Sequence, residues 1–222
     1  MIKIYLSAST QEKNVGVAGY GTEEDNMFIL RDLTEKYIQE GGTTFSIEKN
    51  NYKSSTLVDI VKESNSFNPD IHLAFHSNAG IKARGCEVYY SMYTKNEKGK
   101  LLANYWYNEI SELTPTTDRG VKSDGCLYSR GLYELRETKS VAALMEFFFH
   151  SSPEDVKFFL SNKEDFAIGT AIAIYKYFGL TYKSKYLYRV YAGAYAMEEN
   201  AKNQVKKLKE KGFDSYYKKE EV

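Results

Sequence analysis

The chain reads VAALMEFFF at residues 141–149. Nearly every residue of this run is apolar, which is the pattern of a central strand buried on both faces of a sheet. Glu146 is the exception, and a carboxylate is costly to bury unless it binds a cation or a proton. The run therefore predicts the centre of a parallel sheet and also marks one candidate functional residue.

Strand and helix patterns alternate on both sides of this run, over residues 1–180. We expect further strands at 2–6, 43–47, 71–76 and 85–91, and helices at 23–39, 54–63, 102–113, 153–160 and 163–178. Residues 116–131 show no clear period and are expected to form a surface loop. The alternation predicts an α/β domain with a twisted, largely parallel (mixed) sheet of about six strands flanked by helices.

A second, smaller pattern follows a polar linker at residues 181–186. Residues 187–195 and 213–217 read as strands on either side of a helix at 198–211, which predicts a small C-terminal β-α-β segment at 187–222. A segment of this length is short for an independent core. We therefore expect it to pack on the domain at 1–180, on a second copy or on another partner.

Composition excludes some classes of protein. The 222 residues include 30 basic and 30 acidic side chains, and this balance argues against nucleic-acid binding by bulk charge. No apolar stretch is long enough for membrane insertion. The N-terminus shows no signal peptide, so we expect synthesis in the cytoplasm. Cys86 and Cys126 are isolated and are expected to be reduced thiols, with a disulfide between them left open.

The chain has three histidines, His72, His76 and His150. His72 and His76 are four residues apart in an expected strand, so both point to one face. His150 follows Glu146 by the same spacing. Each residue taken singly has an ordinary structural explanation, such as a hydrogen-bonded histidine or a carboxylate paired with an arginine. The joint presence of His76 and Glu146 at strand ends of one sheet favours a functional site.

Residues 1–180 also carry several short motifs in a fixed order. They are LSASTQ (6–11), GTEE (21–24), DIHLAFHSNA (70–79), GCEV (85–88), RGVK (119–122), LYEL (132–135), ALMEFFFH (143–150) and PED (153–155). This set resembles the zinc-dependent N-acetylmuramoyl-L-alanine amidases. These enzymes cleave the bond between the lactyl group of muramic acid and L-alanine in peptidoglycan.

The resemblance implies a Zn2+ ion as cofactor. In the family, zinc is held by a histidine at the end of the first strand, a glutamate at the start of the first helix and a histidine in the Ser-Asn-Ala-type turn. His76 matches the last of these, and Glu23 matches the helix glutamate, with Glu24 as the adjacent alternative. Glu146 matches the catalytic glutamate, which would take a proton from a zinc-activated water and pass it to the leaving nitrogen.

The chain departs from the family at the first ligand, because Thr10 stands where most members have histidine. A neutral hydroxyl is a poor zinc ligand compared with imidazole. His150 is the first candidate replacement, followed by Gln11 and His72; alternatively a water fills the position, or metal and activity have been lost. His150 could instead orient a ligand or stabilise the oxyanion.

Substrate contacts are also implied. Asn78 lies in the family's turn motif, and Arg119 and Lys122 could meet carboxylates of the stem peptide, although an ordinary solvated loop explains these two equally well. The C-terminal segment resembles one half of a SPOR domain, a peptidoglycan-binding module. Tyr191 and Tyr195 could stack on sugar rings there. Two chains could pair their halves in a homodimer, or the half could pack on the domain at 1–180.

The resulting hypothesis is a peptidoglycan hydrolase that acts on the bacterial cell wall after release, either as a phage endolysin or as a sporulation autolysin. The alternative is a non-catalytic wall-binding protein whose metal site has decayed at Thr10. A third interpretation is a metallocarboxypeptidase-like hydrolase on a related sheet.

Overall fold

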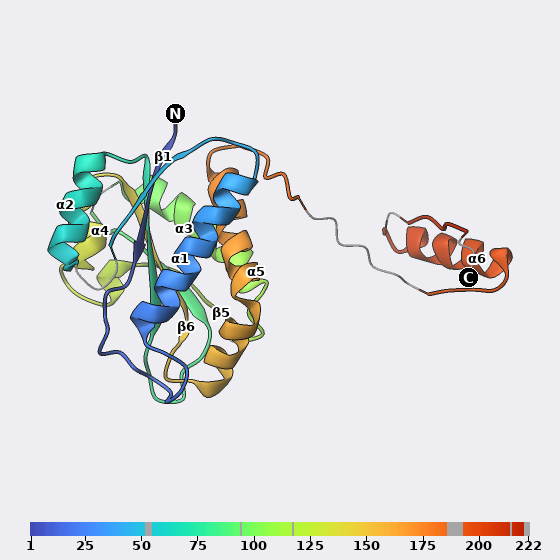
Figure 1. Cartoon of the computed structure of the whole chain (residues 1–222), viewed down its shortest axis with the longest axis horizontal. Helices are drawn as coiled ribbons and strands as arrows, with labels where there is room; N and C mark the ends of the chain where they lie inside the picture. The colour runs from blue at the N-terminus through green and yellow to red at the C-terminus, as the bar shows by residue number, and fades with distance from the viewer. Residues whose placement is uncertain (52–54, 94, 117, 186–192, 214, 220–222) are drawn as a thin grey trace. The chain divides into compact units, whose positions relative to one another are not determined.

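The computed structural model describes residues 1–51, 55–93, 95–116, 118–185, 193–213 and 215–219. The chain divides into two compact units, Met1–Lys185 and Tyr186–Val222 (Figure 1). The first unit contains, in chain order, β1 (Lys3–Ala8), α1 (Glu23–Glu40), β2 (Ser46–Lys49), α2 (Leu57–Phe67), β3 (Ile71–Asn78), β4 (Cys86–Tyr90), α3 (Asn96–Ser111), β5 (Asp118–Ser123), the 3-10 turn η1 (Asp124–Cys126), α4 (Tyr133–Glu137), β6 (Val141–Phe149) and α5 (Pro153–Tyr177).

The six strands form one sheet in the order β2-β1-β3-β6-β4-β5. The pairs β2–β1, β1–β3 and β3–β6 are parallel. β4 is also parallel to β5, but it is antiparallel to β6. The predicted fold class, a largely parallel mixed sheet of about six strands, is confirmed. The antiparallel direction of β4 matters for the site, because it brings the N-terminal end of β4 beside the C-terminal ends of β3 and β6.

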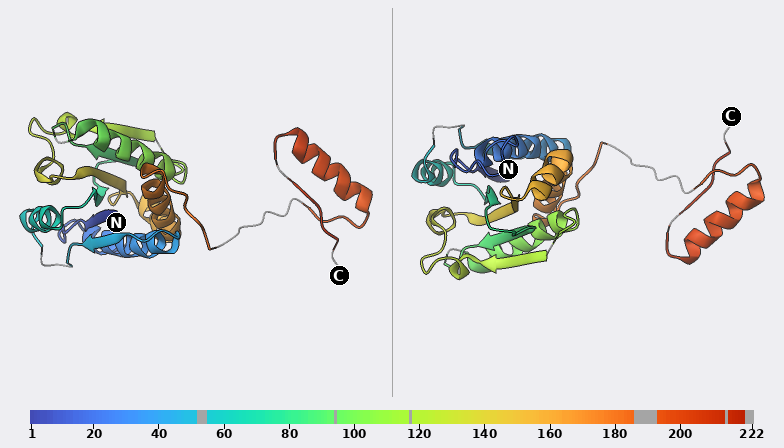
Figure 2. Two further views of the ribbon diagram at one scale, coloured as in Figure 1. Left: turned by 90° about the horizontal axis from the view of Figure 1, so that it is seen from above. Right: turned by 90° about the horizontal axis from the view of Figure 1, so that it is seen from below.

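Helices cover the two faces of the sheet unequally. α1, α3 and α5 pack on one face, and the shorter α2 and α4 lie on the other (Figure 2). The main core forms under the three long helices, where alternate residues of β1, β3 and β6 meet aromatic side chains. The Phe75 ring, for example, lies 5.4 Å from the Trp106 ring and 5.5 Å from the Phe147 ring, measured between centroids. The face under α2 and α4 has only a small apolar cluster, so it has room for polar groups.

The central strand β6 has the predicted bounds, Val141–Phe149. All of its residues are buried except Glu146, which is partly exposed. A register shift interrupts the pairing of β3 with β6 between His76 and Asn78. Irregularities of this kind are frequent next to active sites, because they change the direction of side chains.

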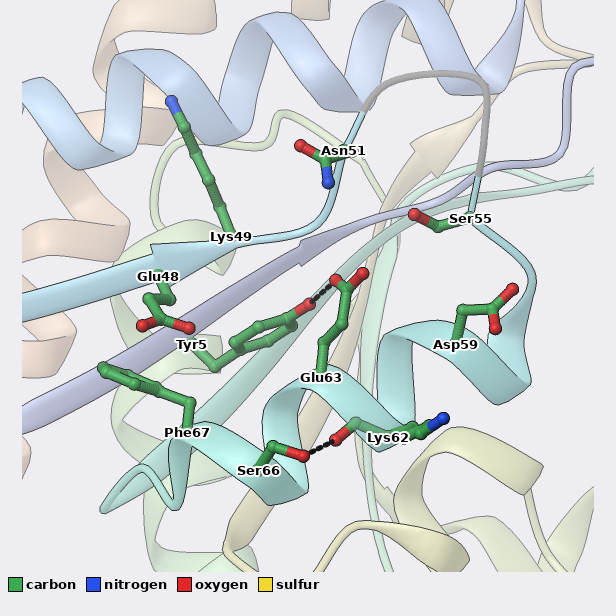
Figure 3. A pocket seen from close by; sticks show the side chains of 10 residues that line it. All are labelled: Tyr5, Glu48, Lys49, Asn51, Ser55, Asp59, Lys62, Glu63, Ser66 and Phe67. Atoms are coloured by element: carbon green, nitrogen blue, oxygen red, sulfur yellow. Dashed lines mark hydrogen bonds between the residues drawn. The ribbon is translucent and has the colours of Figure 1, made fainter.

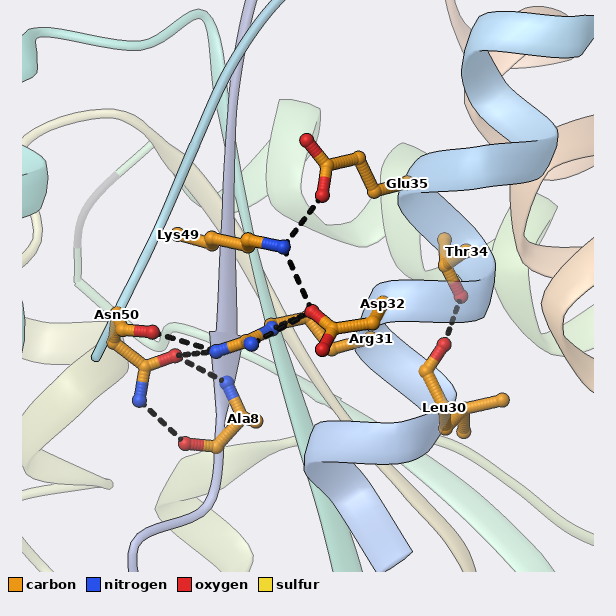
Figure 4. Close-up of polar contacts among 8 residues, drawn as sticks. All are labelled: Ala8, Leu30, Arg31, Asp32, Thr34, Glu35, Lys49 and Asn50. Atoms are coloured by element: carbon orange, nitrogen blue, oxygen red, sulfur yellow. Dashed lines mark hydrogen bonds and ion pairs between the residues drawn. The ribbon is translucent and has the colours of Figure 1, made fainter. Parts of the chain in front are cut away.

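The end of β1 is held by Asn50, a buried residue that follows β2 (Figure 4). Its side-chain amide donates to the carbonyl of Ala8 at 2.9 Å and accepts from the Ala8 N–H at 2.8 Å. Arg31 of α1, also buried, donates to the Asn50 carbonyl at 2.6 Å. The chain therefore leaves β1 toward Thr10 from a fixed position.

One expectation for this unit was wrong, and another was confirmed. Residues 118–123 were expected in a loop but form β5, which pairs with β4 at the edge of the sheet. The strand is polar, and edge strands lack the apolar alternation that would reveal them. The two helices expected at 153–160 and 163–178 together form α5, and they meet at a kink at the non-helical Asn162 (φ −126°, ψ 18°), so the predicted break is confirmed. The Asn162 side chain donates to the Phe158 carbonyl at 2.8 Å, which competes with the helical backbone.

The second unit contains the helix α6 (Glu198–Glu210), close to the predicted helix at 198–211. Most of the strand expected at 187–195 lies outside the described residues, and residues 193–195 are not in a strand. Of the strand expected at 213–217, the described residues 213 and 215–217 have no strand assignment either. Within the described parts of the chain, no helix is long and apolar enough to cross a membrane.

Candidate active site

Three polar side chains stand in a row across the middle of the sheet. Glu146 of β6 is paired in register with His76 of β3 on one side and with Glu87 of β4 on the other. Residues paired in this way point to the same face, and this face is the one covered by α2 and α4. A carboxylate thus lies between an imidazole and a second carboxylate on the less covered face of the sheet.

The carboxyl group of Glu146 is in an unfavourable environment for a negative charge. Burial raises its pKa from 4.5 to about 7, and the charges of Glu23 and Glu87 act in the same direction, while His76 opposes them. Among the described residues, none hydrogen-bonds to the buried Oε2 atom of Glu146. A carboxyl group with a pKa near neutrality and a free oxygen atom is suited to accept and release a proton.

Glu23 and His76 are in direct contact. Thr22 caps the start of α1, and its hydroxyl accepts from the Asp25 N–H at 3.0 Å. This cap places Glu23 at the first position of the helix, with its Oε1 atom 3.0 Å from Nδ1 of His76. Asn14 donates to the other carboxylate oxygen at 2.7 Å. Of the two adjacent glutamates in the GTEE motif, Glu23 is therefore the one that contacts the histidine.

Contacts with each other and with neighbouring residues determine the pKa values of Glu23 and His76. Burial by itself would raise the pKa of Glu23, but hydrogen bonds from His76, Asn14 and Ser9 lower it overall. Burial would likewise lower the pKa of His76, but Glu134 and Glu23 raise it well above its usual value of 6.5. The two carboxylates thus favour the protonated form of His76.

Glu87 has no role in the sequence analysis, yet three of the five residues expected to bind substrate converge on it. Asn78 donates to its Oε1 atom at 2.6 Å, the Lys122 ammonium makes a short contact with Oε2, and Nε of Arg119 lies 3.3 Å from Oε2. The Glu87 side chain is buried, whereas both basic side chains are about one-third exposed. Lys122 and Arg119 thus balance a buried carboxylate and also reach solvent beside Glu146.

His150 lies just after β6, in the turn that faces the end of β3. Its Nδ1 atom is 3.0 Å from both the carbonyl and the hydroxyl oxygen of Ser77, and its backbone N–H donates to the Asn78 carbonyl. Because a carbonyl can only accept, the proton of a neutral His150 ring lies on Nδ1 and the lone pair on Nε2. In the described contacts, His150 reaches the neighbour of His76 rather than His76 itself.

The remaining candidate replacements for the first ligand differ in position. Thr10 is partly buried at the end of β1, and Gln11 is exposed and accepts from Asn14. His72 is fully buried with both ring nitrogens engaged: Nδ1 lies 2.9 Å from the Ser64 hydroxyl, and Nε2 lies 2.9 Å from Glu134. His72 therefore has no free nitrogen for a metal ion.

The donor set for a metal ion is partial. Glu23 and His76 meet, and Nε2 of His76 and Oε2 of Glu146 are buried atoms without hydrogen-bond partners among the described residues. Over the same residues, no group of three or more His, Cys, Asp and Glu side chains is arranged to hold a metal ion. The residues thus fit two of the three protein ligands that a catalytic zinc site normally has.

Glu134 is a second residue that sequence reasoning missed. It lies in α4 and contacts both His72 and His76. Burial would raise its pKa, but the hydrogen bond with His72 and the charges of the two histidines lower it overall. Its position in the LYEL motif carries no periodic signal that separates it from an exposed helix residue, so only the folded structure reveals its contacts.

The aromatic candidates in the second unit are less informative. Tyr191 lies outside the described residues. Tyr195 is 44% exposed, which leaves its ring accessible to a ligand.

A separate pocket of about 790 Å³ lies beside β2 and α2 (Figure 3). Its walls are polar and of mixed charge, and they include Tyr5, Lys49 and Glu63. Glu146, His76 and Glu23 do not line it. Tyr5 is nevertheless connected to the site, because its ring stacks on His72 at a centroid distance of 5.2 Å.

Comparison with known families gives two matches. Residues 4–175 match the family described as N-acetylmuramoyl-L-alanine amidase, and residues 181–221 match the SPOR domain. The first match covers more than half of the chain and includes every residue of the candidate site.

Two curated relatives match over nearly the whole chain. The N-acetylmuramoyl-L-alanine amidase CwlM of Bacillus licheniformis is 24% identical over 223 residues, and the sporulation-specific N-acetylmuramoyl-L-alanine amidase of Bacillus subtilis (strain 168) is 25% identical over 224 residues. Each alignment covers 97% of this chain and 84% of the relative.

Solved structures share the fold. The catalytic domain of the amidase CwlV from Bacillus (Paenibacillus) polymyxa var. colistinus has a TM-score of 0.70 at 19% identity, and covers 82% of this chain and 100% of that one. The amidase AmiC2 of Nostoc punctiforme has a TM-score of 0.66 at 18% identity, with 80% and 97% covered. At these identities the likeness concerns the fold alone.

Proposed function

The chain belongs to the N-acetylmuramoyl-L-alanine amidase family, and we propose that it hydrolyses the amide bond between N-acetylmuramic acid and L-alanine in peptidoglycan. The observation that carries this proposal is the position of Glu146. Its carboxyl group has a pKa of about 7, keeps an oxygen atom without a partner among the described residues, and neighbours His76 across the sheet. These features support a role for Glu146 as the proton acceptor of the hydrolysis.

We propose that Zn2+ is the cofactor and that Glu23 and His76 hold it. When bound there, zinc would polarise the scissile carbonyl and acidify a water molecule. Their side chains meet at 3.0 Å, and they supply one carboxylate oxygen and one imidazole nitrogen, both of which are common zinc ligands.

His150 is the proposed third ligand in place of a histidine at Thr10. The Ser77 carbonyl accepts the Nδ1 proton of His150, which leaves the Nε2 lone pair available. A second hydrogen bond that fixes the tautomer is the usual companion of a ligating histidine. Thr10 offers only a neutral hydroxyl, so its contribution would be to hold a water molecule.

The chain's own residues then divide the work of amide hydrolysis. Glu146 takes the proton of the attacking water and transfers it to the departing L-alanine nitrogen. A pKa of about 7 serves both steps, because the group can exist in either state near neutral pH. Asn78, Arg119 and Lys122 surround Glu87 and are the proposed contacts for the stem peptide; the two basic groups would attract its carboxylates.

Digestion of purified peptidoglycan tests the proposal. We expect the wild-type protein with zinc to release peptides that begin with L-alanine and to leave glycan strands with free lactyl groups, as identified by mass spectrometry. Treatment with a chelator should abolish release, and added zinc should restore it. Release of single C-terminal amino acids would instead indicate a carboxypeptidase, and a lack of any release would overturn the amidase proposal.

The second unit matches the SPOR domain, and we propose that it binds peptidoglycan through the exposed Tyr195 and through Tyr191. Among its described residues the unit has one helix, α6, in which no residue is buried, and pairing with a second copy in a homodimer would give it a core. Sedimentation of the full chain at micromolar concentration tests the pairing, because a monomer would contradict it.

A non-catalytic wall-binding protein is the second candidate. The observation in its favour is Thr10, together with the lack of a third ligand beside Glu23 and His76 among the described residues. Binding to peptidoglycan without release of any peptide, in the presence of zinc, would support it. In either case we propose that the protein acts on the cell wall after release from the cell in which it is made; as an amidase it would be an endolysin or an autolysin.

A further inference from the structure

Glu134 connects the two histidines of β3. Its Oε1 atom lies 2.9 Å from Nε2 of His72 and accepts a short hydrogen bond from the Ser7 hydroxyl. Its Oε2 atom lies 3.5 Å from Nε2 of His76. The side chain is 3% exposed, so protein groups rather than water compensate its charge. One carboxylate oxygen of Glu134 thus contacts His72 and Ser7, and the other faces His76.

Contacts with several side chains hold His72 in place. The Ser64 hydroxyl lies 2.9 Å from Nδ1, and the Tyr5 ring stacks on the imidazole with an interplanar angle of 20°. The Tyr5 hydroxyl in turn donates to Glu63 of α2 at 3.0 Å (Figure 3). His72 has no exposed surface. A carboxylate anchored to such a ring has little freedom to move.

The backbone also fixes Glu134. The buried Asp124 accepts from the N–H groups of Leu132 and Met92, at 2.9 and 2.8 Å, which sets the start of α4. Gly131 precedes this start with φ +64°, and a Cβ atom there would lie 2.5 Å from Asp124 Oδ2. Only glycine fits that turn, so the sequence just before α4 is adapted to place this helix, and with it Glu134, over the sheet.

We infer that Glu134 is a positioning residue of this amidase: from 3.5 Å its Oε2 atom attracts a proton to Nε2 of His76, which leaves Nδ1, on the Glu23 side, as the ligating atom. The inference rests on the proposed function, since it concerns the histidine proposed to bind zinc. A carboxylate that accepts from the second ring nitrogen of a ligating histidine fixes its tautomer and orientation. Here Glu23 lies at the Nδ1 side and Glu134 at the Nε2 side of the same ring.

The test uses the full chain with ¹⁵N-labelled histidine, first free of metal. The three histidines allow each ring to be assigned by single substitution. We expect Nε2 of wild-type His76 to show the ¹⁵N chemical shift of a protonated ring nitrogen, and Glu134→Gln to lower the protonated fraction at Nε2. Tyr5→Phe is the matched control, because it removes the hydroxyl contact to Glu63 but keeps the ring over His72; its His76 signals should equal those of the wild type.

Zinc affinity, measured by competition with a chelating dye, is the second readout. We expect Glu134→Gln to weaken zinc binding by about 10- to 100-fold, the usual loss for such a partner, and Tyr5→Phe to leave it unchanged. If Glu134→Gln does not fold, His72→Gln takes its place and should shift the His76 signals in the same direction. Wild-type ring signals and zinc affinity in the variant would overturn the inference. Failure of the wild type to bind zinc would instead overturn the proposed cofactor, and the metal-free spectra would still decide the role of Glu134.

Discussion

The Nδ1 atom of His76 lies 3.0 Å from the Oε1 atom of Glu23, although the two residues are 53 positions apart in the chain. One side chain comes from the end of β3 and the other from the first turn of α1. The Ser77 N–H and Asn14 also direct hydrogen bonds at the Glu23 carboxylate, at 3.4 and 2.7 Å. The pair is therefore organised by the fold before any ion binds, which reduces the rearrangement that binding requires.

Replacement of Glu146 by glutamine tests its role as proton acceptor. An amide of the same size cannot take a proton from water, so we expect the rate of peptide release from peptidoglycan to fall by about 10²- to 10⁴-fold. Because Glu23 and His76 are unchanged, zinc affinity should stay within a few-fold of the wild-type value. Release kinetics with purified peptidoglycan provide the measurement. A variant with near-normal turnover would remove Glu146 from this role.

The same variant gives a pH dependence of stability in the metal-free protein. The pKa of Glu146 is about 7 in the folded state, above its usual value of 4.5, so the folded state binds the proton more tightly than the unfolded state. This contribution to stability is complete below pH 4.5 and is lost as the pH rises toward 7. Glu146→Gln should therefore become more stable relative to the wild type across this window, by roughly 1–3 kcal/mol. Urea unfolding at several pH values measures it, and a constant difference would contradict the assignment.

Gly16 is expected to be essential for the loop between β1 and α1. It has φ +60°, and a Cβ atom there would lie 2.2 Å from the carbonyl oxygen of His150, which already accepts from the Val17 N–H. Gly16→Ala should cost about 1–2 kcal/mol of backbone strain and a further 1–3 kcal/mol from the clash. Gly19→Ala is the control, because Gly19 also has a positive φ (+86°) but open space around it. Equal losses of unfolding free energy in the two variants would refute the contact.

Asn50 provides a test of how the end of β1 is held (Figure 4). Asn50→Ala removes both hydrogen bonds to Ala8 and leaves the Arg31 guanidinium short of one acceptor, so we expect a loss of about 2–4 kcal/mol of unfolding free energy. Lys49→Ala is the neighbouring control: Lys49 makes partly exposed ion pairs with Asp32 and Glu35, which typically contribute about 0–1 kcal/mol. Denaturant titrations of both variants compare the two costs. Similar values would show that Asn50 is not the anchor of β1.

The parts of the fold that sequence analysis predicts are those with strong apolar patterns. β6 is found at its predicted bounds because its nearly continuous apolar run is typical of a strand buried on both faces, and eight of its nine residues are buried. β5 was missed, since a polar strand at the sheet edge is stabilised by pairing with β4 rather than by its own side chains. The antiparallel direction of β4 was likewise not visible, because direction depends on the path of the connecting chain.

The sequence predicted those site residues whose type is unusual for their surroundings or that belong to a family motif. A lone carboxylate in an apolar run points to Glu146, and the family motifs point to Glu23 and His76. Glu87 and Glu134 were not predicted, because each sits in a polar or mixed segment where a charged residue is ordinary. Their roles arise from contacts with residues distant in the chain, such as Lys122 for Glu87 and His72 for Glu134.

The contact of Glu134 with both His72 and Ser7 has an evolutionary consequence. A buried carboxylate that loses one of its donors becomes a net cost to the fold, so single replacements in this group should be selected against. Ser7, His72 and Glu134 are thus expected to be inherited as a unit, and lineages that abandon one of them should abandon the others.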